Sequence, residues 1–302
     1  MNCVTCINFY FSFIGLCTRV EELISFLQMH DVLPQSIDCP TCNKPCVLNQ
    51  DTSHLRFRCR RTSKVYKKRT TKRFSFSAKK GTFFDGSHLD ITTICQFVCH
   101  WLHSSYPRQR FICQQLQMTP VTVVYWSHFC RQVCIDYLTR NSVILGGEGV
   151  TVEIDEAKIG KRKYNQGRRI EAQWIFGGFE PVARRKSSSF QLRTVPQVIR
   201  KYIKPGISAP HHSLTFVDPV TGAHTQNIER LWRGVRGGIS QYWRKKGHMV
   251  GYLAEFMFKR SVDPANLIHE FMRAAATLYP PSGPTTGEEP PDEPRPGPSS
   301  AP

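Results

Sequence analysis

The segment VEIDEAKIGKRKYNQGRRIEAQWIFGGFE, residues 152–180, carries the pattern that indicates the fold class of the C-terminal half of this chain. Both of its ends are rich in β-branched and aromatic residues and alternate with polar ones, which predicts strands over 151–160 and 169–181. SSSFQLRTV predicts a third strand over 187–195. Helical spacing of apolar residues predicts helices over 195–203, 222–238, 251–260 and 266–279. This half of the chain is therefore expected to be a mixed α/β domain.

The N-terminal half is predicted to be mostly helical. Apolar residues at helical spacing indicate a helix within 18–34, and three more helices within 88–140. Thr119 is expected to cap the last of these three, with Pro120 at its first position. A turn precedes that last helix, so the unit is compatible with a helix-turn-helix.

The composition of the chain points to a polyanionic partner. The chain has 302 residues and a formal net charge of +18. Charge of this size favours nucleic acid, because Lys and Arg that neutralise phosphates release counterions. A membrane is not expected, since no apolar run reaches the roughly 18 residues that span a bilayer. The first 17 residues lack the basic start and cleavage site of a signal peptide.

The spacing of several cysteines fits metal binding or helical packing better than a disulfide scaffold, so we expect a reducing compartment, nucleus or cytoplasm. Cys39 and Cys42 form a C-x-x-C pair, and Cys59 follows at the distance expected for a second pair. No cysteine completes that second pair, and Cys46 or His54 is the candidate fourth zinc ligand. The alternative is that these are thiols without a metal on a small hairpin.

A basic stretch follows the cysteines. Twelve Lys or Arg and no acid lie between Arg56 and Lys80, interleaved with aromatic residues. A charge run is often only a solvated face, but here it stands between a candidate zinc site and candidate DNA-binding helices, which favours contact with DNA. The candidate DNA-binding residues are Arg56, Arg58, Arg60, Arg61, Lys64, Lys67, Lys68, Arg69, Lys72 and Arg73.

Asp155 and Glu229 are the candidate acids of the C-terminal half. Asp155 shares a strand face with Glu153, and a carboxylate within an apolar strand is costly unless it meets a cation. Glu229 stands beside the apolar stripe of its predicted helix. The alternative is two local ion pairs, Asp155 with Lys158 or Arg162 and Glu229 with Arg233. The residues alone leave both interpretations open.

The segment at 152–180, together with FVDPVTGAHTQNIERLWRGVR at 216–236, resembles the Merlin superfamily of DDE transposases and its bacterial relatives, the ISXO-like transposase domain. CPTC, GTFFDGS and the helices that follow resemble the zinc ribbon and helix-turn-helix region of that family. The resemblance covers roughly residues 20–275. It implies an RNase H-like sheet and DNA as partner, namely the terminal repeats of a transposon. Such transposases generally act as oligomers.

The family uses two Asp and one Glu to hold two Mg²⁺ or Mn²⁺ ions, which activate an attacking oxygen and stabilise the leaving one. By resemblance, Asp155 is the first acid and Glu229 the third. The family's second Asp follows a segment like YIKPG and lies on the fourth strand. Here YIKPG (202–206) runs directly into ISAPHHSLTFVDP, and Asp218 belongs to a different family block. The resemblance therefore implies an internal deletion near 206–211 that removes the fourth strand and the second catalytic acid.

Two functions are consistent with this pattern. The first is a transposase-derived protein that binds DNA but has lost most or all of its chemistry. The alternative is a non-enzymatic DNA-binding regulator that descends from a transposase. The division of the chain expected from these arguments is an N-terminal extension at 1–34, a zinc-ribbon-like segment at 35–87, a helix-turn-helix-like region at 88–145, a transposase domain at 146–279 and a disordered Pro-rich tail at 280–302.

Overall fold

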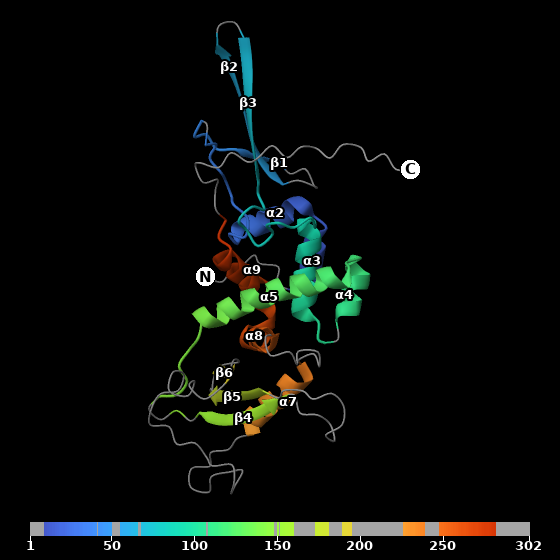
Figure 1. Cartoon of the computed structure of the whole chain (residues 1–302), viewed down its shortest axis with the longest axis vertical. Helices are drawn as coiled ribbons and strands as arrows, with labels where there is room; N and C mark the ends of the chain where they lie inside the picture. The colour runs from blue at the N-terminus through green and yellow to red at the C-terminus, as the bar shows by residue number, and fades with distance from the viewer. Residues whose placement is uncertain are drawn as a thin grey trace.

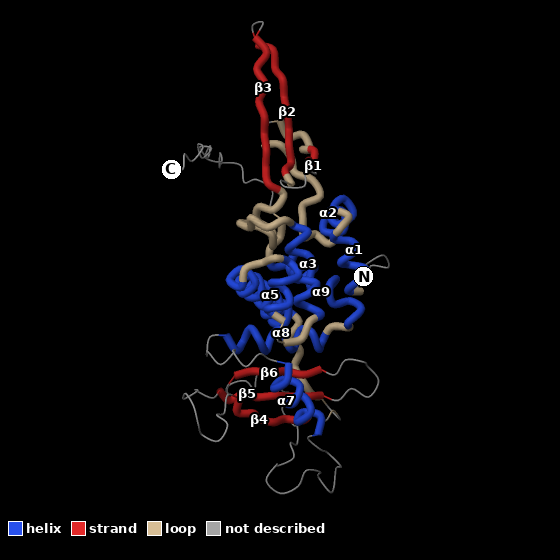
Figure 2. The backbone as a smooth tube through the Cα atoms, turned by 90° about the vertical axis from the view of Figure 1, so that its right-hand side faces the viewer, coloured by secondary structure: helices blue, strands red, loops and turns tan. Residues whose placement is uncertain are grey.

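The computed structural model describes residues 9–40, 42–49, 55–65, 68–106, 108–147, 150, 152–159, 173–180, 189–194, 226–238 and 248–281. The molecule is elongated, with a two-stranded ribbon projecting at one end, helices in the middle and a small sheet with one helix at the other end (Figure 1). A view turned by 90° gives the same order of layers (Figure 2). None of the described helices is long and apolar enough to cross a bilayer.

The middle of the molecule is a helical core. Its helices are α1 (Tyr10–Cys17), α2 (Val20–Met29), α3 (Ile91–His103), α4 (Gln109–Leu116), α5 (Pro120–Arg140), α8 (Met249–Ser261) and α9 (Leu267–Leu278), with a short 3-10 turn at Pro264–Asn266. The predicted cap at the start of α5 is confirmed, because the Thr119 hydroxyl accepts from the Thr122 N–H at 3.2 Å and Pro120 takes the first helical position. The turn before α5 contains Gln117 in the left-handed conformation.

The C-terminal helices α8 and α9 pack against the N-terminal ones. α8 contributes Ala254 and Phe258 to the helical core and presents Met249, Leu253 and Met257 to the small sheet unit. α8 therefore contributes buried residues to both hydrophobic clusters. α8 also carries Glu255, whose buried carboxylate forms three ion pairs, with Arg108 at 2.6 Å, Arg131 at 3.2 Å and Lys259 at 3.0 Å.

These ion pairs determine the charge state of Glu255. Burial alone would raise the pKa of this carboxyl, but Lys259, Arg108 and Arg131 outweigh it and hold the pKa at about 2. A buried acid is tolerated only when cations and hydrogen bonds replace its water. Tyr106 supplies one such bond by donating to Glu255 at 2.9 Å. The cluster connects α5 and α8 to the loop that precedes α4.

The sheet at the lower end has three antiparallel strands in the order β4-β5-β6, formed by Glu153–Ile159, Gln173–Glu180 and Ser189–Thr194. Helix α7 (Gln226–Gly238) lies against it, with Ile228, Leu231 and Trp232 in the shared core. A side chain at Gly177 would place its Cβ only 2.7 Å from the Trp232 ring, so this glycine lets the helix approach the sheet.

The sequence predicted most of these elements. All three strands are confirmed. The helices predicted over 222–238, 251–260 and 266–279 are also confirmed and correspond to α7, α8 and α9. The predicted helix at 195–203 and the proposed deletion near 206–211 lie outside the described residues. The structure thus shows a mixed helix-and-sheet chain with small antiparallel sheets.

The upper end is a second antiparallel sheet, β1-β2-β3, formed by Val47–Asn49, Arg56–Val65 and Lys68–Ser77. β2 and β3 pair along all ten of their residues, from Arg56 opposite Ser77 to Val65 opposite Lys68. Phe57 is buried at the base of the pair. The basic stretch of the sequence is therefore a ribbon that extends away from the helices (Figure 1).

Candidate functional site

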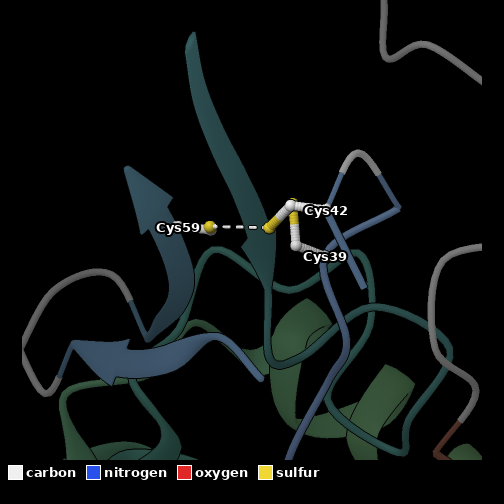
Figure 3. A group of neighbouring side chains, drawn as sticks. All are labelled: Cys39, Cys42 and Cys59. Carbon is white, nitrogen blue, oxygen red and sulfur yellow. Dashed lines mark hydrogen bonds between the residues drawn. The ribbon is translucent and has the colours of Figure 1, made fainter. Parts of the chain in front are cut away.

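A cysteine cluster lies at the base of the ribbon. Cys39 and Cys42 stand on a tight turn, in which the Cys42 and Asn43 N–H groups donate to the Cys39 carbonyl at 3.2 and 2.8 Å. Asn43 takes the left-handed conformation that lets this turn close. Cys59 comes from β2 and completes the group (Figure 3). The turn and the strand thus bring the thiols of Cys42 and Cys59 together, although these two residues are 17 positions apart in the sequence.

The distances in this cluster suit a tetrahedral metal ion. The sulfurs of Cys39, Cys42 and Cys59 all lie within 4.8 Å of one another, and Cys42 and Cys59 are 3.6 Å apart. Sulfurs bound to zinc at about 2.3 Å in a tetrahedron lie about 3.8 Å apart. Hydrogen bonding with Cys42, followed by burial, raises the pKa of Cys59 to about 12. A divalent cation would reverse that preference, because it binds the thiolate form.

Cys46 is the candidate fourth ligand that the structure describes. Its thiol is buried, and its pKa is raised by burial first and then by the neighbouring Cys39 and Cys42. Cys46 therefore lies beside the cluster, although it is outside the group whose sulfurs are all within 4.8 Å. His54 lies outside the described residues. The three cysteines singled out by their spacing could hold a metal such as zinc.

The other predicted site places Asp155 on β4 and Glu229 on α7. One Asp155 carboxylate oxygen accepts from the Trp232 indole N–H at 2.9 Å, and the other accepts from the Glu156 N–H at 2.7 Å. Glu229 is exposed in the first turn of α7. It precedes Trp232 by three residues, so the two share one surface of the helix. Asp155 thus contacts α7 one turn away from Glu229.

The structure also shows what Glu153 does, a role that the sequence analysis did not assign. Glu153 is buried, and its carboxylate accepts from the Asn227 N–H at 3.0 Å, the Ile228 N–H at 2.9 Å and the Asn227 side-chain amide at 2.6 Å. It therefore caps the N-terminus of α7, where the helix dipole favours an anion. The signal in the sequence was its position two residues before Asp155, on the same strand face.

The acids of the lower sheet do not form a three-acid metal site among the residues that the structure describes. In those residues, the three cysteines are the group of three or more potential ligands close enough to share an ion. The Glu153 carboxylate accepts its hydrogen bonds from the start of α7. The predicted Mg²⁺ or Mn²⁺ pair at Asp155 and Glu229 remains an expectation from resemblance.

The predicted DNA-binding residues fall on the ribbon. Arg58 and Arg60 are exposed near its base, and Arg56 donates to the Ser75 hydroxyl at 2.7 Å. Arg61, Lys64, Lys68, Arg69, Lys72 and Arg73 occupy strand positions further along β2 and β3. Lys67 lies outside the described residues. The pairing therefore collects most of the predicted cations onto one slender element.

Comparison with models of protein families, with curated proteins and with solved structures found no match to this chain.

Proposed function

We propose that this chain is a DNA-binding protein derived from a DDE transposase, in which the cleavage and strand-transfer chemistry is lost or severely reduced. The observation that carries DNA binding is the basic ribbon. Its two paired strands hold Arg and Lys without an acid and project away from the folded body. A projecting cationic element meets phosphates at little steric cost and gains affinity through counterion release.

The cysteine cluster supports this function because it would fix the base of the ribbon. Zinc held by Cys39, Cys42 and Cys59 would join the turn before β1 to strand β2. A structural zinc site contributes folding free energy directly. The ribbon would then keep one orientation relative to the helices, and the partner would meet a preformed surface.

The transposase origin is supported by the sequence blocks around Asp155 and Glu229 and by the close packing of β4 against α7. An RNase H-like domain belongs to this proposal, with Asp155 and Glu229 as descendants of acids that held two Mg²⁺ or Mn²⁺ ions. Two acids are a poor set for two such ions, since Mg²⁺ needs nearly ideal geometry from its few carboxylates. The proposal includes action in the nucleus and an oligomer of this chain on DNA.

DNA binding is tested with the full chain in a titration of duplex DNA against salt. We expect the logarithm of affinity to fall steeply and linearly with the logarithm of salt concentration. Absence of binding at low salt would reject the function.

The loss of chemistry is tested on DNA that carries matched terminal repeats, with Mg²⁺ or Mn²⁺ present. We expect no cleavage by the natural chain. Robust cleavage that depends on metal and disappears in Asp155→Ala would show that the chemistry survives.

The second candidate is a non-enzymatic regulator of related elements. It is favoured by the hydrogen bonds at Asp155, since both of its oxygens accept from protein N–H groups. The same titration on different duplexes distinguishes it, because a regulator requires preference for one sequence over others. Equal affinity for all duplexes would argue against a regulator and leave general DNA binding.

A further inference from the structure

The register of the ribbon sets like charges opposite one another. Arg60 pairs with Arg73, Arg61 with Lys72, and Lys64 with Arg69. Like charges directly opposite destabilise an antiparallel pair. The segment from Arg56 to Lys80 contains no acid that would compensate. This arrangement costs stability in the isolated chain, and a polyanion bound along the ribbon would offset that cost.

The same register divides the ribbon into two unequal faces. Alternate positions of a strand share a face, and residues directly opposite share it as well. The first face, called here the cationic face, is defined by six Arg or Lys and four Ser or Thr. Its positions are Arg56, Arg58, Arg60, Thr62 and Lys64 on β2, and Arg69, Thr71, Arg73, Ser75 and Ser77 on β3.

At the base of the ribbon, the second face packs against the helical core. Phe57 opposes Phe76 there, and Cys59 opposes Phe74. Phe57 is 1% exposed, and Phe74 and Phe76 pack against the helical core. Further along, this face has the cations Arg61, Lys68 and Lys72. The anchoring residues and the candidate metal ligand Cys59 therefore share one face.

The side chains described at the base agree with this division. Arg58, Arg60 and Ser75, all on the cationic face, are exposed, whereas Arg56 and Ser77, the pair nearest the helices, are half-buried. The cationic face is therefore exposed at Arg58, Arg60 and Ser75, and the register continues it toward the tip. No apolar residue interrupts its ten positions.

We propose that the cationic face of the ribbon lies along a groove of duplex DNA, with its Arg and Lys on phosphates and its hydroxyl residues as additional hydrogen-bond donors. This inference deepens the proposed DNA binding and rests on it. A B-DNA major groove about 12 Å wide admits a two-stranded ribbon. Ten residues at about 3.4 Å each extend about 34 Å, close to one helical turn of DNA.

Duplex DNA is the partner that this shape favours. The major groove of an RNA duplex is too deep and narrow for protein side chains to read. A face that carries hydroxyl residues between cations suits a phosphate backbone, since hydroxyl and guanidinium groups both donate to phosphate oxygens. The metal site on the opposite face would hold the ribbon from behind without covering the surface that meets DNA.

Two triple variants of the full chain test the inference. The first removes three charges from the cationic face: Arg58→Gln, Arg60→Gln and Arg73→Gln. The second removes three from the opposite face: Arg61→Gln, Lys68→Gln and Lys72→Gln. Both lower the net charge equally, so an effect of overall charge alone predicts equal losses. Zinc content and the thermal midpoint of each variant check that it folds.

The measurement is the salt dependence of affinity for duplex DNA. The first triple is expected to reduce the slope by about 2.7, since each phosphate contact contributes about 0.9. The second is expected to reduce it by less than about one. Equal reductions, or a larger one for the second triple, would overturn the assignment of the face. If the chain bound single-stranded DNA or duplex RNA more tightly than duplex DNA, the assignment of a DNA groove as the binding site would be overturned.

The two measurements distinguish failure of the proposed function from failure of this inference. If the natural chain binds no DNA, the proposed function falls. If it binds DNA and neither triple changes the slope, DNA binding stands and the ribbon is excluded as its site. The conservative triple Arg58→Lys, Arg60→Lys and Arg73→Lys is expected to keep the slope of the natural chain, because a phosphate contact needs a cation and not a particular side chain.

Discussion

The Glu153 carboxylate accepts a hydrogen bond from the backbone N–H of Ile228 at 2.9 Å, across 75 residues of sequence. This bond and the two from Asn227 hold the first turn of α7 on strand β4. Trp232 then donates to Asp155 one turn further along. Two residues of one strand face thus position the helix that carries Glu229.

Glu153→Ala should destabilise the chain by about 1–3 kcal/mol, because it leaves buried N–H groups without an acceptor and removes an anion from a helix N-terminus. The matched control is Glu156→Ala on the same strand, where the side chain is exposed, with an expected change below about 0.5 kcal/mol. Urea unfolding measures both. Equal losses would show that Glu153 is not the cap.

Gly177→Ala should cost about 1–3 kcal/mol, since a Cβ at 2.7 Å from the Trp232 ring forces the helix or the ring to move. Gly237→Ala on α7 is the control, because a Cβ there meets nothing within 4 Å. Alanine also favours the helix by up to about 1 kcal/mol at such a position. A neutral Gly177→Ala, measured by the same unfolding experiment, would contradict the close packing of α7 on β5.

Metal analysis of the purified full chain should find about one zinc ion per molecule, since a structural site holds one ion in a tetrahedron. Cys59→Ser should lower that content sharply, whereas Cys113→Ser, on α4 and away from the cluster, should not. Cys46→Ala and His54→Ala separate the candidate fourth ligands. A folded natural chain without zinc would exclude the site.

A histidine pair should make stability depend on pH. His30 donates through Nδ1 to the Phe26 carbonyl at 2.7 Å, so in the neutral ring its Nε2 accepts from His269 Nδ1 at 3.0 Å. Burial is the main cause that lowers the pKa of both rings, with Arg273 adding to it, while Asp31 opposes it at His30 and Glu270 at His269. The pair joins α2 to α9.

Both folded pKa values lie below the unfolded value of about 6.5, so the unfolded chain binds more protons as the pH falls. Stability is fully present above that value and decreases as the pH drops through it toward the lower folded values. His30→Gln should reduce this slope, measured as the urea midpoint between pH 7.5 and about 5. Exposed His128→Gln is the control, and an equal effect from it would refute the role of the pair.

The sequence predicted the elements that depend on local patterns. Alternation around Asp155 indicated β4, and apolar spacing around Leu231 indicated α7, because the pattern of buried positions repeats with the geometry of each element. The cap at Thr119 could be predicted because its hydrogen bond joins residues only three positions apart. The spacing of Cys39, Cys42 and Cys59 indicated a cluster that the structure brings together.

The pairing of the basic stretch was not predicted, since a run of like charges is unfavourable in a hairpin and its register depends on Phe57 and Phe76 meeting the helical core. The joining of α8 to the N-terminal helices was also missed. Glu255 and its partners Arg108 and Arg131 are far apart in sequence, and no local pattern indicates which charges are buried together.

Local patterns therefore predicted the class of the elements, and the net charge, the cysteine spacing and the resemblance on which the proposed function rests are also read directly from the sequence. Only the folded chain shows that Glu153 caps α7, that Gly177 admits Trp232 and that the cations divide between two faces of one ribbon. The difference arises from the range of the interactions. Backbone propensity and periodicity act over a few residues, whereas the partner of a buried carboxylate and the register of a ribbon are fixed by packing between segments that meet only in the folded chain.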